Sequence, residues 1–262
     1  MVKPVSFTFE DINIDEISTF VGRVAILVTP DGRMDNAARR VNRLTKGAVA
    51  RLAEDDLKAG DARVLAYPVG MAASAVDVIC IEKRATQEEA RAAGVALGKK
   101  RGSDNVLLCL GNQSKAAQIV LGLALRDYSF DDHKTVDAAD DERSVTVMAA
   151  KPDEVKAAAE PLLAIAEGAF FTRDLVNEPA NVLTTQSFAD RLVAMSDLGL
   201  EVEVLEEDKL AELGMGALLS VGQGSVSPSK VVVMKWMGGE ADTAPLALIG
   251  KGVVFDTGGI SL

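Results

Sequence analysis

Histidine and cysteine are scarce in this chain of 262 residues, which has one histidine and two cysteines. His133 stands in a polar stretch, where a solvated loop residue is a simpler interpretation than a catalytic one. A single histidine gives almost no basis for a serine–histidine triad or a histidine-rich zinc site. Cys80 and Cys109 lie in apolar stretches without CxxC spacing, so the sequence predicts two buried, reduced thiols and no thiolate zinc site.

Aromatic residues make up only 4% of the chain, whereas hydrophobic residues as a whole make up 48%. The core must therefore consist of Ala, Val, Leu and Ile, a composition that suits an α/β architecture with helices covering a sheet.

Basic residues are outnumbered, 28 against 39 acidic ones, and the net charge is −11. Such a surface repels nucleic acid and anionic membranes, so neither is an expected partner. The longest basic run, residues 99–101, falls at the end of a predicted helix, where cations favour the helix dipole. No apolar run approaches membrane-spanning length and the N-terminus lacks a signal-peptide core, which predicts a cytoplasmic protein.

The first 150 residues alternate between strand and helix patterns, which predicts an N-terminal α/β domain with a central mixed sheet. Strands are predicted over 21–28, 63–67, 76–81, 105–110 and 144–148, and helices over 34–57, 86–100 and 115–127. Thr86 and Glu89 form a capping-box pattern, and Ser114 is the predicted cap of the third helix.

A long helical stretch rich in Ala and Glu follows over residues 153–176, with Pro161 placed to occupy the first turn of a second segment. We expect three parts: a domain over 1–150, a linker helix over 151–176 and a second α/β unit over 177–262. In the second unit, helices are predicted at 184–195 and 208–213, and strands at 200–205, 231–236 and 245–249.

The last residues carry the most chemistry. The apolar stretch 246–250 predicts a buried strand, and Lys251 and Asp256 follow it among four glycines. Active sites of open α/β sheets lie at the carboxyl ends of strands. A carboxylate can bridge two divalent ions, and a lysine amine can bind one after losing its proton. Taken alone, this pattern also fits an ordinary glycine-rich turn.

Two sequence stretches resemble the leucyl (cytosol) aminopeptidase family of metallopeptidases. LIGKGVVFDTGGISL at residues 248–262 is similar to the family's G-K-G, F-D-[ST]-G-G segment. TRDLVNEPANVLT at residues 172–184 is similar to its R-D-L-V-N-x-P-x-N-x-L-T stretch, and the resemblance covers roughly residues 165–262.

The resemblance implies that residues 177–262 are the N-terminal part of an α/β metallopeptidase catalytic domain. It implies two divalent ions of manganese, zinc or magnesium, with Lys251 as a ligand of one ion and Asp256 as a bridge between both. The implied reaction releases leucine-type N-terminal residues from peptides with a water that the two ions activate. The family also implies a homo-oligomer, a hexamer.

The sequence departs from the family pattern in the number of site residues. The family's electrophilic lysine would follow Leu262, and its N-T-D-A-E-G-R segment is not in this sequence. We therefore expect a chain that ends inside the metal-binding motif, with no catalytic residue identified, and that is incomplete and inactive alone. The alternative is a non-catalytic α/β module that binds a ligand or forms an oligomer.

Overall fold

A computed structural model describes residues 4–54, 57–135, 143–240, 242–256 and 258. The chain divides into two compact units, Met1–Asp174 and Leu175–Leu262. None of the described helices combines the length and apolar character that crossing a membrane requires.

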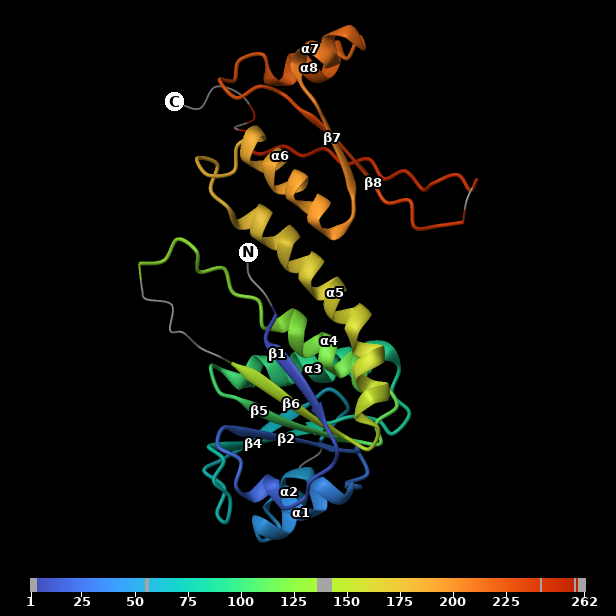
Figure 1. Cartoon of the computed structure of the whole chain (residues 1–262). Coiled ribbons are helices and arrows are strands. Elements are labelled where there is room, and N and C mark those ends of the chain that lie inside the picture. The colour runs from blue at the N-terminus through green and yellow to red at the C-terminus, as the bar shows by residue number, and fades with distance from the viewer. Residues whose placement is uncertain (1–3, 55–56, 136–142, 241, 257, 259–262) are drawn as a thin grey trace. The chain divides into compact units, whose positions relative to one another are not determined.

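The unit Met1–Asp174 is built on a six-stranded sheet with strand order β1-β6-β5-β2-β4-β3 (Figure 1). Its strands are β1 (Ser6–Glu10), β2 (Arg23–Val28), β3 (Ala62–Ala66), β4 (Ala75–Cys80), β5 (Val106–Gly111) and β6 (Ser144–Ala149). Neighbouring strands are parallel except β3, which runs antiparallel to β4. The predicted α/β class with a mixed central sheet is confirmed.

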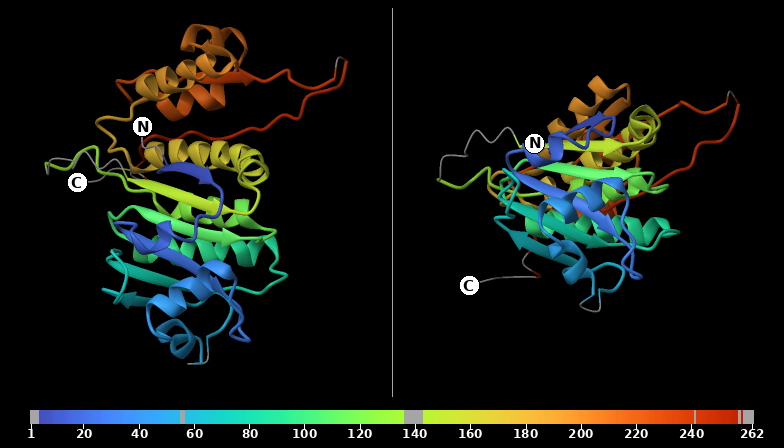
Figure 2. Two further views of the ribbon diagram at one scale, coloured as in Figure 1. Left: turned by 60° about the horizontal axis from the view of Figure 1, so that its bottom comes forward. Right: turned by 90° about the horizontal axis from the view of Figure 1, so that it is seen from below.

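Helices cover both faces of this sheet (Figures 1 and 2). Helices α1 (Asn36–Leu44) and α2 (Ala48–Ala53) pack on one face, against Val24, Ile26 and Val28 of β2. Helices α3 (Gln87–Arg101), α4 (Ala116–Arg126) and α5 (Pro152–Asn177) contribute to the apolar cluster on the other face. The central strands are buried on both faces, which explains their continuous apolar sequences.

The single helix predicted over residues 34–57 is wrong, because α1 and α2 are separated by a turn. Lys46 and Gly47 adopt positive φ angles of 51° and 82°. Asn42 holds the turn together, since its carbonyl accepts from Gly47 N at 2.8 Å and its side-chain Oδ1 accepts from Ala50 N at 2.9 Å. A left-handed residue cannot continue a right-handed helix.

The second helix segment predicted to begin at Pro161 is not separate from the first, because α5 is one helix from Pro152 to Asn177 with Pro161 inside it. Proline removes the hydrogen bond that residue 161 would give to the carbonyl of Ala157. Both residues are exposed, so water can reach that carbonyl and the helix tolerates the proline.

Helices α3 and α4 approach each other backbone to backbone at two glycines. A Cβ added to Gly94 would lie 2.0 Å from the carbonyl oxygen of Ile119, and one added to Gly122 would lie 2.0 Å from that of Arg91. These contacts are with rigid helical backbone, so no side-chain rotation can relieve them. Glycine is therefore required at both positions.

We predict that Gly94→Ala lowers the free energy of unfolding by about 1–3 kcal/mol, because the added methyl group forces the two helices apart. Urea denaturation monitored by circular dichroism measures this change. Gly168→Ala in α5 is the matched control, since a Cβ there meets nothing within 4 Å. Alanine should be neutral or stabilising by about 0.5–1 kcal/mol at that helical position. Equal effects of the two substitutions would contradict the close approach.

The unit Leu175–Leu262 contains a smaller, two-stranded sheet. Antiparallel strands β7 (Glu201–Leu205) and β8 (Val231–Lys235) pair with Glu203 opposite Val233. Its helices are α6 (Thr185–Val193), η2 (Ala194–Leu198), α7 (Glu207–Glu212) and α8 (Gly216–Gly222). Thr184 caps α6 as predicted, with its hydroxyl accepting from Ser187 N at 3.3 Å.

Candidate functional site

The segment that follows β8 carries the two predicted metal ligands, but it is not the buried strand that the sequence predicts. The structure assigns no strand to residues 246–250, and Leu246 and Ile249 are 86% and 99% exposed. A strand gains its hydrogen bonds and side-chain contacts only from a neighbour. Within the described part of the unit Leu175–Leu262, β8 pairs with β7 and no strand pairs with this segment.

Asp256 lies in a turn that fixes one of its two carboxylate oxygens. Its Oδ1 accepts a hydrogen bond from Gly258 N at 2.6 Å, and Gly258 has a φ of 71°, which favours glycine. The residue is exposed, and within the described part of the chain Oδ2 has no hydrogen-bond partner. This is an Asx turn, which orients the carboxylate relative to the loop backbone.

Lys251 is exposed between two glycines in the same segment. A Cβ added to Gly252 would lie 2.8 Å from Cε1 of Phe188, so the backbone of this segment lies against the Phe188 ring of α6. Because residue 252 has no side chain, the chain on the carboxyl side of Lys251 packs closely on α6.

The chemistry of Lys251 and Asp256 suits a divalent ion, since Asp256 supplies a hard oxygen donor and Lys251 supplies an amine. Within the described ranges, however, no group of three or more His, Cys, Asp or Glu side chains is arranged to hold a metal. Two donors are too few for a closed shell around even one ion. The segment therefore has the donors for part of a metal site.

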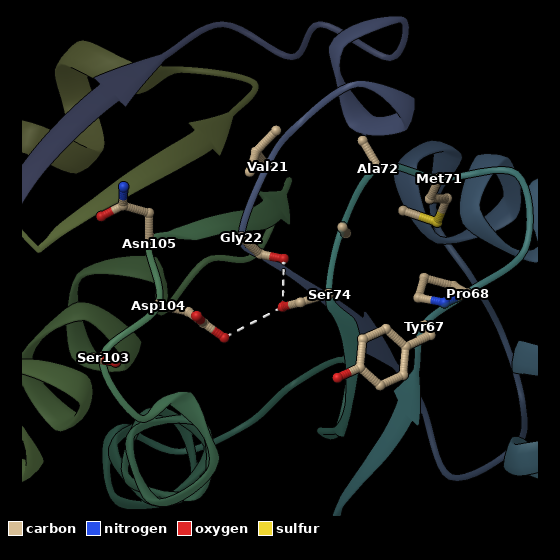
Figure 3. A pocket seen from close by; sticks show the side chains of 11 residues that line it. Val21, Gly22, Tyr67, Pro68, Met71, Ala72, Ser74, Ser103, Asp104 and Asn105 are labelled. Carbon is tan, nitrogen blue, oxygen red and sulfur yellow. Dashed lines mark hydrogen bonds between the residues drawn. The ribbon is translucent and has the colours of Figure 1, made fainter.

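A cleft at the amino-terminal ends of the parallel strands is lined by Ser74, Asp104 and the backbone of Gly22 (Figure 3). The Ser74 hydroxyl lies 2.9 Å from the Gly22 carbonyl oxygen and 3.3 Å from Oδ2 of Asp104. Both neighbours accept its single proton, and the chain's only histidine, His133, is not among the lining residues. Ser74 therefore ties the start of β2 to the loop before β5, and the cleft offers it no histidine of the kind that a serine–histidine pair requires.

Beneath this cleft, Arg23 and Asp77 form a buried ion pair between β2 and β4. Arg23 donates from Nε at 2.9 Å and from Nη2 at 2.7 Å, and the Asp77 side chain is fully buried. The hydrogen bond to Asp77 raises the pKa of Arg23. A bidentate pair of this kind holds the guanidinium in one orientation.

We predict that Asp77→Ala lowers the free energy of unfolding by about 3–5 kcal/mol, because it leaves the Arg23 charge without its buried partner. Urea denaturation measures the change. Glu154→Ala removes an exposed pair with Lys151 at 2.7 Å, and it should change stability by less than about 1 kcal/mol. A loss below about 1 kcal/mol for Asp77→Ala would show that the pair is dispensable.

Arg173 and Asp174, near the end of α5, have packing roles. Arg173 donates to the Leu125 carbonyl oxygen at 2.8 Å, and its guanidinium lies 5.3 Å from the Tyr128 ring centre. Asp174 is 4% exposed and accepts from the Tyr128 hydroxyl at 3.1 Å. Both side chains thus attach α5 to the end of α4.

The two cysteines are free and buried, as predicted. Burial raises the pKa of the Cys80 thiol to about 11 and that of Cys109 to about 12. Both thiols therefore stay neutral at physiological pH, and neither can serve as a nucleophile.

We predict that a disulfide reagent such as DTNB labels neither cysteine of the native protein at about pH 8, because the reactive thiolate is nearly absent there. Both should react once the chain is unfolded in guanidinium chloride, which serves as the internal control. Rapid labelling of the native protein, followed by absorbance at the thionitrobenzoate band, would contradict the burial of these thiols.

Together these features describe an α/β protein that exposes a lysine and an aspartate in a glycine-rich loop of its second unit. Residues 170–262 match the model of the cytosol aminopeptidase family, catalytic domain. The chain is 53% identical over 262 residues to a probable cytosol aminopeptidase of Dinoroseobacter shibae, covering 98% of this chain and 53% of that protein. It is 49% identical to one of Cereibacter sphaeroides, covering 100% of this chain and 54% of that protein. The chain belongs to the cytosol aminopeptidase family.

Among solved structures, the bottromycin maturation enzyme BotP in complex with Mn is similar, with a TM-score of 0.61 and 27% identity. The match covers 81% of this chain and 44% of that one. The chain spans about half the length of the curated relatives it matches.

Proposed function

We propose that the protein is a metal-dependent aminopeptidase that releases leucine-type N-terminal residues from peptides. One observation carries this proposal. The chain is 49–53% identical along its whole length to probable cytosol aminopeptidases, and Lys251 and Asp256 fall inside the catalytic-domain match. The fold alone does not carry it, because one α/β architecture hosts many activities.

We assign Lys251 as ligand of one ion and Asp256 as a bridge between two. Two bound divalent ions would lower the pKa of a water molecule and polarise the scissile carbonyl. Asp256 contributes a carboxylate that the Gly258 turn orients, with Oδ2 left over for a second partner. Lys251 would contribute the lone pair of its amine nitrogen to one ion. Manganese, zinc and magnesium all suit this pair, and BotP is described in complex with Mn.

The 262-residue chain supplies two donors, so we propose that it has no aminopeptidase activity by itself. Residues 1–150 would form the N-terminal domain, 151–176 the linker helix, and 177–262 the first part of the catalytic domain. We further propose a cytoplasmic location and a hexameric assembly for the whole protein.

A hybrid protein tests this assignment. In it, the chain replaces the matching part of the Dinoroseobacter relative, whose remaining half supplies the rest of the catalytic domain. The hybrid should hydrolyse leucine p-nitroanilide with added manganese and stop when the metal is chelated. Lys251→Met and Asp256→Asn should each lower kcat/KM by at least about 100-fold, because loss of a ligand exceeds the 10–100-fold cost of losing a residue that only supports one.

Lys209→Met and Asp208→Asn are matched controls, because they remove the same groups from exposed positions of α7 in the same unit. Both should retain the activity of the hybrid. Circular dichroism establishes that each variant is folded before its activity is compared. An active hybrid that tolerates Lys251→Met and Asp256→Asn would overturn the ligand assignment, and a folded hybrid that is inactive with every metal would overturn the proposed activity.

A further inference from the structure

The connections that leave β2 and β5, two neighbouring strands at the middle of the six-stranded sheet, lead to opposite edges of the sheet. After β2 the chain enters α1 on one face and continues outward to β3 and β4, whereas after β5 it enters α4 on the other face and continues to β6. Strands β2 and β5 are neighbours, so their connections diverge. Open α/β sheets bind ligands at such a point, outside the carboxyl ends of the strands.

A cavity of about 840 Å³ lies at that point in the unit Met1–Asp174. Its lining comes from the carboxyl ends of β2, β4 and β5 and from the loops that follow them. The strand ends align, since Val28 pairs with Cys80. The apolar part of the lining consists of Leu27, Val28, Met34, Ile81 and Leu110. The volume falls in the range of sites for small organic molecules, about 300–1,000 Å³.

One wall of this cavity is a tight hairpin that its own hydrogen bonds hold in place. Val28 and Met34 form an isolated antiparallel bridge. The Thr29 hydroxyl accepts from Arg33 N at 3.0 Å and donates to the Asp31 carboxylate. The wall is thus formed without a ligand, which lowers the entropic cost of binding one.

At the end of β5, Gly111 leaves room for the carboxylate of Asp35. Gly111 has a φ of 55°, and a Cβ there would lie 2.3 Å from Oδ2 of Asp35. Asp35 is held by its other oxygen, since Oδ1 accepts from Ala38 N at 2.8 Å as the cap of α1. The strand end therefore presents its backbone without a side chain in the way.

Two of the cations that line the cavity can hold an anion. Among the acidic residues, Asp31 is paired with Arg33 at 2.9 Å and Asp35 caps α1. Arg39 and Lys83 also line the cavity, and neither forms an ion pair within the part of the chain that the structure describes. The lining thus holds three acidic side chains and three basic ones, so its charges balance, whereas the whole chain has a net charge of −11. Arg39 and Lys83 are exposed, and they are the two cations of the lining that can meet an anion.

We propose that this cavity binds a small organic anion. The apolar or aromatic part of the ligand contacts the side chains at the strand ends, and its single phosphate or carboxylate group lies between Arg39 and Lys83. The site lies in the unit Met1–Asp174 and does not rest on the aminopeptidase activity. Phosphate and carboxylate ligands share this chemistry, and a binding experiment can separate them.

Isothermal titration calorimetry of the 262-residue chain tests the proposal with two pairs of probes. Adenosine 5′-monophosphate is compared with adenosine, and N-acetylleucine with N-acetylleucinamide. We expect at least one anion to bind at least about tenfold more tightly than its neutral counterpart, since a charge-assisted hydrogen bond contributes at least that factor. The anion that binds more tightly shows whether the site prefers a phosphate or a carboxylate group.

The double variant R39Q/K83Q should weaken binding of that anion by about tenfold or more while the fold is retained. K99Q/K100Q is the matched control, because it removes two cations from another part of the same unit that does not line this cavity. It should leave the affinity unchanged. Absence of binding by both anions, equal binding of charged and neutral probes, or an unchanged affinity in R39Q/K83Q would each overturn the proposal.

Discussion

The parallel pairing of β2 with β4 on one side and with β5 on the other is the constraint on which the unit Met1–Asp174 depends. It buries β2 on both faces, so nearly every position of the three strands must be apolar. Asp77 is the exception, and its burial requires Arg23 from the adjacent strand. The same pairing brings three carboxyl ends to one edge, and Gly94 and Gly122 let α3 and α4 lie backbone to backbone on one face of the sheet. The apolar core, the Arg23–Asp77 ion pair and the cavity at the strand ends thus all follow from the parallel pairing of β2.

The sequence predicts the central strands well because burial on both faces produces short continuous apolar runs, as at 106–110. It does not predict β1, since Ser6–Glu10 alternates exposed and half-buried residues and gains order mainly from pairing with β6. The capping box of Thr86 is predictable because both of its hydrogen bonds lie within four residues. Ser114 is not the cap of α4; Lys115 takes that place without a side-chain hydrogen bond. The turn between α1 and α2 has Lys46, not glycine, at its first left-handed position, so the sequence does not show that the helix ends there.

The candidate sites also differ in how far the sequence predicts them. Lys251 and Asp256 stand out because a specific string of residues surrounds them, and composition alone would not separate them from a glycine-rich turn. The strand predicted before them fails, since a strand needs a neighbour and none pairs with it among the described residues. The cavity formed by the ends of β2, β4 and β5 cannot be predicted from the sequence. Met34, Lys83 and Leu110 lie far apart in the chain, and only the strand order brings them to one cavity.

The two units therefore differ in the features they present: a preformed cavity in the first, and the exposed Lys251 and Asp256 in a loop of the second. The central proposal is that Lys251 and Asp256 hold divalent ions in the assembled catalytic domain. The most direct test is the manganese content of the hybrid protein, measured by inductively coupled plasma mass spectrometry after gel filtration. About two ions per chain are predicted, as in other two-metal hydrolases, with loss of metal in the variant lacking both donors. Retention of both ions by that variant would contradict the account.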